Sequence, residues 1–346
     1  MKRREKDMSA LTKYYKRVKR HPIQYTRMAV QIAFALFMLF VGFRFYQFYQ
    51  HFNTMGIEPL VPRPGVVEGF LPVSALVGLK VWVTTGIFDP IHPAGLVLFT
   101  FFVASGFIFR KAFCGWICPI GTLGEWLARF GRKLFKRNFD MPRWLIWILT
   151  PLKYLILIFF IKAIIFDMPV FYAIDFMAGN YNKISDVKMM MFFLNIGGVG
   201  LTVLLVLAVL SVFFKNFWCR VLCPYGAMIG LGSVLGITKI KRNEETCIDC
   251  NACTRVCPQR ISVSTKKAVR TPDCSACMSC VEVCPVKDTL NMTVANKKVN
   301  KWTIPIAFFA TFFIVVAIAK LTGHWETMIT YEEFRMLIPS VNNIGH

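Results

Sequence analysis

The sequence predicts a membrane α-helical protein with about five transmembrane helices and one cysteine-rich α+β domain inserted before the last helix. Hydrophobic residues make up 55% of its 346 residues, and its mean hydropathy of +0.51 is high for a soluble domain. Several separate apolar stretches have roughly the twenty residues that a helix needs to cross a bilayer. The chain also holds 12 cysteines, and most of them fall within one short polar region near the C-terminal end.

Five apolar stretches are expected to span the membrane, because each is continuous and carries few charges. They cover about 28–48, 92–109, 144–166, 192–214 and 303–321.

Two further features of the apolar sequence lead to predictions, one outside these five stretches and one within the fourth. Segment 70–88 is apolar too, but Pro72 and Lys80 interrupt it, so we expect it to lie at the interface or to fold back against the bundle. The glycines at 197, 198 and 200 lie within the fourth stretch, where small residues are expected to serve helix packing.

The basic residues predict the topology. The chain has a net charge of +22, and most of its 41 Lys and Arg residues fall in three regions, 1–27, 110–143 and 215–301. Because these regions flank apolar stretches, the charge indicates membrane orientation and not nucleic-acid binding. The positive-inside rule places the N-terminus and all cysteines on the cytoplasmic side of a bacterial inner membrane, and the C-terminus in the periplasm.

This topology divides the chain into four parts. They are a basic cytoplasmic N-terminus (1–27), a four-helix membrane region (28–235), a cytoplasmic cysteine-rich domain (236–300), and a fifth transmembrane helix with a short periplasmic tail (301–346).

The cysteine-rich domain contains two runs of the form C-x2-C-x2-C-x3-C-P, the pattern of bacterial two-cluster ferredoxins. We therefore expect a ferredoxin-like domain with two [4Fe-4S] clusters; a pair of structural zinc sites is the alternative. In this pattern the fourth cysteine of each run binds the other cluster. The expected ligand sets are Cys247, Cys250, Cys253 and Cys284 for the first cluster, and Cys274, Cys277, Cys280 and Cys257 for the second.

The remaining cysteines form two C-x3-C-P pairs within an internal repeat. FRKAFCGWICPIG at 109–121 aligns without a gap to FKNFWCRVLCPYG at 214–226, so a parallel repeat would bring both pairs to one depth. Three interpretations stay open: a shared third cluster or metal ion, a redox-active dithiol, or structural cysteines. Nearby basic residues at 110, 111, 215 and 220 are expected to favour thiolates. The four cysteines are Cys114, Cys118, Cys219 and Cys223.

Other polar groups near the predicted spans are weaker candidates. Lys153 lies inside the third span, where it could face a quinone or a partner carboxylate, but we expect it to extend toward the basic inner surface. Asp89, His92, Tyr172 and Asp175 lie beside the outer helix ends, where a quinol headgroup could bind, although ordinary interfacial chemistry explains them as well. No haem-binding or nucleotide-binding motif is visible.

The cysteine motifs, set among apolar spans, resemble the membrane polyferredoxins. That family includes the NapH-type quinol dehydrogenase subunit, the C-terminal part of NosR and the CcoG-like 4Fe-4S membrane proteins. The resemblance covers about residues 70–290 and is most specific at FCGWICPIGTLGEW, FWCRVLCPYGAM and CIDCNACTRVCP. It implies electron transfer at the membrane. The chain differs from NosR in leaving no room for a large periplasmic flavin domain, and from CcoG in its short C-terminal tail.

The sequence therefore predicts an iron–sulfur protein that relays single electrons between the quinone pool, or a membrane partner, and a respiratory reductase. It would be an electron-transfer component of a quinol-linked oxidoreductase complex, with other redox subunits as partners. One alternative is a maturation reductase that delivers electrons to a metal centre or disulfide of another enzyme. Another is a redox-sensing or anchoring membrane protein without turnover.

Overall fold

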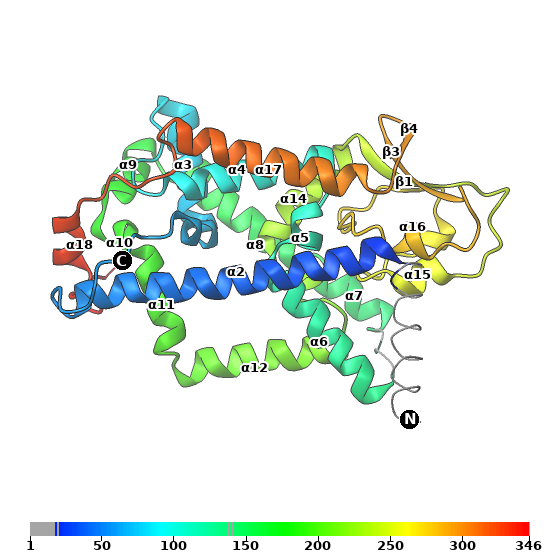
Figure 1. Ribbon diagram of the computed structural model, residues 1–346, viewed down its shortest axis with the longest axis horizontal. Coiled ribbons are helices and arrows are strands. Elements are labelled where there is room, and N and C mark those ends of the chain that lie inside the picture. Colours follow the sequence, from blue (N-terminus) through cyan, green and yellow to red (C-terminus); the bar gives the residue numbers. More distant parts are fainter. Residues whose placement is uncertain (1–17, 19–20, 137–138, 140, 346) are drawn as a thin grey trace, which may run out of the picture.

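The computed structural model describes residues 18, 21–136, 139 and 141–345, so most of the predicted N-terminal segment 1–27 lies outside the described residues. The described chain is an elongated helical bundle with a small sheet domain at one end, and the C-terminus lies at the opposite end (Figure 1). The membrane helices and turns are α2 (Pro22–Asn53), η1 (Gly65–Phe70), α3 (Pro72–Thr85), α4 (Pro93–Phe109), α5 (Ala112–Trp116), α6 (Pro119–Phe135), α7 (Arg143–Leu149), α8 (Leu152–Ile161), η2 (Lys162–Asp167), α9 (Val170–Ala178), α10 (Asn180–Lys183), α11 (Ser185–Leu194), α12 (Gly198–Phe213), α13 (Phe217–Val221), α14 (Pro224–Leu235), α17 (Thr303–Leu321) and α18 (Tyr331–Leu337).

Within the described ranges, three helical segments are long and apolar enough to cross a membrane, at 22–53, 144–167 and 303–321, with up to a fourth if one bent pair is a single span. These three match predicted spans, although α2 extends beyond the expected 28–48. Helix α4 has 17 residues, and at about 1.5 Å per residue it is several ångströms shorter than a 30 Å hydrocarbon core. The count of five spans therefore stays a prediction.

The predicted continuous span at 192–214 is wrong in its shape. Helix α11 ends at Leu194. The helix is interrupted there, and α12 then continues at an angle of 81° to α11. A Cβ atom on Gly197 or Gly198 would meet nothing within 4 Å, so these two glycines do not serve helix packing as expected. They stand at the bend, where Asn195 and the glycine pair weaken the helix.

Segment 70–88 folds back against the bundle, which is one of the two positions expected for it. Helix α3 packs against α4 and α9, and its Lys80 is buried. The Lys80 ammonium donates to the carbonyl oxygens of Ile164 and Ile165, at 2.9 and 3.0 Å. It thereby satisfies backbone acceptors at the end of a span, where the helix has no donors of its own.

The internal repeat is present in the structure as well. Helices α4, α5 and α6 begin at 93, 112 and 119, and their counterparts α12, α13 and α14 begin at 198, 217 and 224, a constant offset of 105 residues. Each copy thus consists of an apolar helix, one helical turn that carries the first cysteine, and a helix that begins at the proline after the second cysteine. The second copy then runs directly into the sheet domain.

The sheet domain contains β1 (Thr238–Arg242), α15 (Ala252–Val256), η3 (Val263–Thr265), β2 (Ala268–Val269), α16 (Ser279–Val283), β3 (Leu290–Val294) and β4 (Lys297–Val299). Its four strands are antiparallel in the order β2-β1-β3-β4. Ile240 and Met292 pair across β1 and β3, and both are buried in the core that continues into the membrane region. The domain is therefore packed onto the bundle and not suspended from it.

Candidate iron–sulfur centres

The structure groups the eight cysteines of the tandem runs into two sets of four. Cys247, Cys250, Cys253 and Cys284 line one cavity. Cys257, Cys274, Cys277 and Cys280 line a second cavity. We call these the outer set and the inner set. In each set, three cysteines come from one run and the fourth comes from the other run, as the ferredoxin pattern requires.

Both cysteine loops bend through the same backbone conformation. Asp249 and Asn251 in the first run have φ of 49° and 56°, and Ala276 and Met278 at the equivalent positions of the second run have 47° and 58°. Asp and Asn tolerate the left-handed conformation, but at Ala276 and Met278 it costs roughly 1–2 kcal/mol per residue. Turns of this kind direct successive backbone N–H groups into a concavity that binds anions, including iron–sulfur clusters. The loops therefore fit the predicted cofactor.

The two sets differ in exposure. All four cysteines of the inner set are buried, and their cavity has the apolar walls Ile240, Ile261, Val263 and Val269. In the outer set Cys250 is exposed, and the neighbouring Ile248 is 64% exposed. One end of the site is thus open to a partner, whereas the other is enclosed by the protein.

Burial also affects the thiols of the inner set. It raises the pKa of Cys257 to about 12, and it raises the pKa of Cys280 well above its ordinary value. Without a bound metal these groups are neutral thiols, so cluster binding must displace their protons.

The two C-x3-C-P pairs converge as the repeat predicts. Cys219 interacts electrostatically with Cys114, Cys118 and Cys223, and the Lys111 ammonium lies close to these sulfurs. Burial raises the pKa of Cys114 to about 12 and that of Cys118 to about 11, and Lys111 offsets only part of this rise. We call these four residues the membrane set.

Lys111 favours the thiolates, as expected of a basic neighbour, but burial outweighs this effect at Cys114 and Cys118 in the metal-free protein. Arg110 faces the sheet domain instead, where its guanidinium donates to the carbonyl oxygens of Thr238 and Thr271, at 2.9 and 2.7 Å. A reactive dithiol needs a lowered pKa, so these raised values speak against dithiol exchange at the membrane set.

The chain segment that carries the first C-x3-C-P pair lies directly on the loop of the inner set. The backbone N–H of Lys111 donates to the carbonyl of Cys274 at 3.4 Å. The indole N–H of Trp116 donates to the carbonyl of Ala276 at 3.2 Å. Between them, a Cβ atom on Gly115 would come within 2.5 Å of the Ser275 carbonyl oxygen. Only glycine allows this contact, which joins the membrane set to the inner set.

Contrary to the expectation from the sequence, Lys153 does not extend freely toward the inner surface; it faces a partner carboxylate, which is one of the alternatives considered for it. It is fully buried, and its ammonium forms an ion pair with the carboxylate of Asp273 at 2.6 Å. Lys111 lies 3.9 Å from the same carboxylate. Burial alone would raise the pKa of Asp273, but the two lysines outweigh it and hold that pKa below its ordinary value.

The start of α2 also contacts the inner set, which the sequence did not indicate. The Glu282 carboxylate accepts from the backbone N–H groups of Ile23 and Gln24, at 2.8 and 3.1 Å. The Gln24 side chain in turn donates to the carbonyl of Cys277 at 3.0 Å. Glu282 and Ile23 are 259 positions apart, so only the tertiary fold brings this helix cap together.

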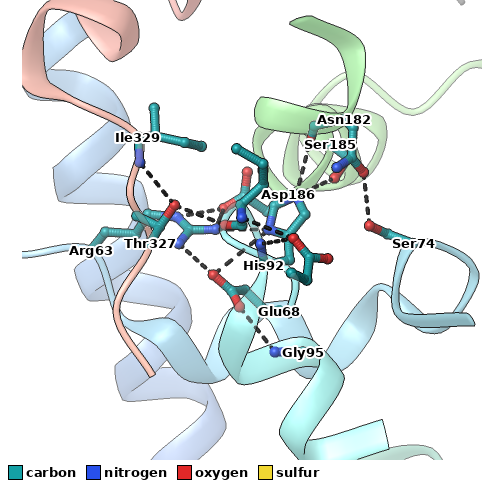
Figure 2. A network of polar contacts seen from close by, with 12 residues as sticks. Arg63, Glu68, Ser74, His92, Gly95, Asn182, Ser185, Asp186, Thr327 and Ile329 are labelled. Atoms are coloured by element: carbon teal, nitrogen blue, oxygen red, sulfur yellow. Dashed lines mark hydrogen bonds and ion pairs between the residues drawn. The ribbon is translucent and has the colours of Figure 1, made fainter. Parts of the chain in front are cut away.

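The polar residues at the opposite end do not form the single quinol site considered above. Asp89 and His92 are buried, whereas Tyr172 and Asp175 are exposed. Figure 2 shows His92 in a network with Arg63, Glu68 and Asp186. Arg63 donates to Glu68 at 2.6 Å and to Asp186 at 2.7–2.8 Å, and the Glu68 carboxylate accepts from the Gly95 backbone at 2.9 Å. This network joins η1, α4 and α11.

Among the residues that the structure describes, no three His, Cys, Asp or Glu side chains lie close enough together to hold a single metal ion. A cubane is held differently from a single ion, since its four thiolates are spread around a cluster of several atoms.

The apolar helices and the cysteine sets together define a membrane protein with iron–sulfur domains. A family model described as a 4Fe-4S binding domain matches residues 91–138 and again 196–243, which are the two repeat copies. A 4Fe-4S dicluster domain model matches residues 239–292. No solved structure matches the chain.

Comparison with known proteins identifies the family. The "Putative electron transport protein YccM" of Escherichia coli K12 is 38% identical over 86% of this chain and 85% of its own length. NosR of Pseudomonas aeruginosa is 29% identical over 48% of this chain, which covers 22% of that protein. The methylamine utilization ferredoxin-type protein MauN of Methylorubrum extorquens is 26% identical over 48% of this chain. The chain belongs to the membrane polyferredoxin family of iron–sulfur electron transport proteins.

Proposed function

We propose that this protein relays single electrons between a membrane donor, the quinone pool or a membrane partner, and a respiratory reductase. The outer and inner sets would each hold one [4Fe-4S] cluster, and these clusters supply one-electron chemistry when bound. The chain's own residues supply the position of each group and its surroundings. The contact between Lys111 and Cys274, which joins the membrane region to the inner set, is the observation that carries this proposal.

The difference in exposure supports a relay between a soluble partner and the membrane. Cys250 and Ile248 offer a surface that another protein can approach. The inner set lies behind this surface, against the membrane region, and apolar walls exclude water from it. Solvent exposure and hydrogen bonds to the sulfurs tune cluster potentials, so the two sets are expected to differ in potential.

We further propose that the membrane set holds a third cluster, since no group of described residues is arranged for a single metal ion. Four cysteines converge there, and the family model that matches both copies of the repeat is one for 4Fe-4S binding. Positive-inside reasoning places all three sets on the cytoplasmic side of a bacterial inner membrane, with the C-terminus in the periplasm.

A groove between α3, α4 and α17 is the place we propose for quinone. Its walls are apolar and include Trp82, Phe88 and Phe101, while Thr322 and His324 provide polar groups at one end. Such a groove suits an isoprenoid tail and a headgroup that needs few hydrogen bonds. It also borders a continuous row of rings: Phe101 packs on Phe102 at 5.4 Å, and Phe102 stacks on Phe113 at 3.9 Å, beside Cys114.

Reduction of the anaerobic protein by a soluble quinol analogue tests this function, with electron paramagnetic resonance (EPR) of the reduced centres as the readout. The proposal predicts that cluster signals appear on addition of quinol. In His324→Leu these signals should be absent or should appear more slowly. Centres that dithionite reduces but quinol never does would contradict the quinone assignment.

A further inference from the structure

A basic cavity lies where the start of α2, helix α6 and the sheet domain meet. Its volume is about 150 Å³, and since one water occupies about 30 Å³ of liquid it is large enough for a phosphate group. Its polar lining consists chiefly of Gln24, Arg27, Glu125, Arg129, Arg132 and Lys215. None of these residues is a cysteine, although Gln24 also donates to the carbonyl of Cys277.

Among the described residues of the lining, basic side chains outnumber acidic ones. Arg27 and Glu125 form a buried bidentate pair, with both N–O distances at 2.8 Å. Arg129 shares the same carboxylate at 3.3 Å. Arg132 adds a further cation, and Glu125 is the one acidic residue among the described residues of this lining. Burial lowers the pKa of Arg129, and repulsion from Arg27 and Arg132 adds to that effect.

The cavity wall also contains polar atoms that lack a partner among the described residues. These are Nε of Arg27, a residue only 3% exposed, and Oδ1 of Asn216. A buried donor without an acceptor destabilises the folded chain by about 1–3 kcal/mol unless a ligand or water satisfies it. Together with the excess charge, the unpaired Arg27 donor indicates an anion that accepts hydrogen bonds. The Asn216 oxygen is itself an acceptor and requires a donor, such as a water molecule.

The helix that carries Arg129 and Arg132 is suited to a membrane surface. Helix α6 exposes the apolar side chains Leu123, Phe130 and Leu134 next to its basic residues. It packs against α12, which leaves the bundle and exposes apolar side chains along its length (Figure 1). A basic amphipathic helix of this kind lies in the plane of the lipid headgroups and attracts anionic lipids.

We propose that this cavity binds the phosphate headgroup of an anionic phospholipid. Pro258 and Ser279, from the loops of the inner set, belong to the same wall. A bound headgroup would therefore connect α2, α6 and the sheet domain at the membrane surface. This binding site is independent of the proposed electron donor and acceptor, so the failure of one proposal leaves the other intact.

Lipid retention in native mass spectrometry tests the site, with the full chain in nanodiscs of phosphatidylglycerol or of phosphatidylcholine. We expect retained phosphatidylglycerol in the wild type, and about fivefold weaker binding in Arg132→Gln, which removes one charge from the lining. Lys133→Gln is the matched control, because it removes a neighbouring exposed charge of α6 that does not line the cavity.

Two results would overturn the proposal. One is a lack of specificity, seen either as equal retention of both lipids by the wild type or as equal loss of lipid in Lys133→Gln and Arg132→Gln. The other is displacement of phosphatidylglycerol by inorganic phosphate at similar concentration, which would assign the cavity to a soluble phosphate compound. Thermal unfolding of each variant, measured in the same nanodiscs, verifies that the exposed substitutions leave the fold intact.

Discussion

The ammonium of Lys153 lies 2.6 Å from the carboxylate of Asp273. Lys153 belongs to a membrane-spanning segment, whereas Asp273 directly precedes Cys274 in the loop of the inner set. A charge pair thus holds the iron–sulfur domain on the membrane region, at the point where the proposed relay passes from one to the other.

Replacing Lys153 by methionine should destabilise this junction. A partly buried carboxylate would lose its nearest cation, although Lys111 at 3.9 Å retains part of the attraction. Because Asp273 is 28% exposed at its side chain, we expect about 1–3 kcal/mol of destabilisation, at or below the range for breaking a buried pair. Thermal unfolding measures it, and Lys162→Met, which breaks an exposed pair on the same span, should have little effect. An unchanged unfolding temperature in Lys153→Met would refute this role.

Gly115→Ala should separate the membrane set from the inner set. Its Cβ would come within 2.5 Å of the Ser275 carbonyl oxygen, and neither backbone can move without disturbing a cysteine loop. Overpacking of this kind destabilises by about 1–3 kcal/mol, and we expect weaker magnetic coupling between the centres in EPR. Gly42→Ala is the control, since nothing lies within 4 Å of its Cβ. Identical behaviour of the two variants would contradict the close contact.

Cys284→Ser should remove the outer cluster even though Cys284 belongs to the second motif. The structure places Cys284 with Cys247, Cys250 and Cys253 around one cavity. We expect about four fewer iron atoms per chain, and the cluster that remains should lose iron slowly to an aqueous chelator. In Cys257→Ser the remaining cluster should instead be the exposed one and lose iron quickly. The reverse pattern would show that each motif binds its own cluster.

The buried network at the opposite end should make stability depend on pH through His92. Burial lowers the pKa of His92, but Glu68 and Asp186 outweigh burial and raise it above the ordinary value. A raised pKa in the folded state means that this stabilisation is complete below about pH 6.5 and is lost as pH rises through the folded-state pKa. Unfolding temperatures from pH 6 to pH 9 should fall for the wild type and stay flatter for His92→Asn. Parallel curves would exclude His92 as the source.

Local sequence patterns predicted the parts of the site that depend on short-range geometry. The cysteine spacing anticipated the two sets of four, because each loop must direct three sulfurs to one point and C-P ends the loop. The match between 109–121 and 214–226 anticipated the convergence of Cys114 with Cys219, because repeated segments adopt equivalent positions.

The remaining contacts could not be predicted because they depend on residues far apart in the sequence. Lys153 and Asp273 are 120 positions apart, and a single sequence gives no signal for their pairing. The bend before α12 was predictable in principle, since Asn195, Gly197 and Gly198 disfavour helix. The continuous apolar run concealed it, because hydropathy measures burial in lipid and not helix continuity.

Iron and acid-labile sulfide per chain, measured on anaerobically purified protein together with EPR of the reduced state, test the central claim most directly. Two clusters in the outer and inner sets predict about eight iron atoms with matching sulfide, and about twelve if the membrane set holds a third cluster. Colourless protein without iron, or protein that contains stoichiometric zinc in place of iron, would contradict it.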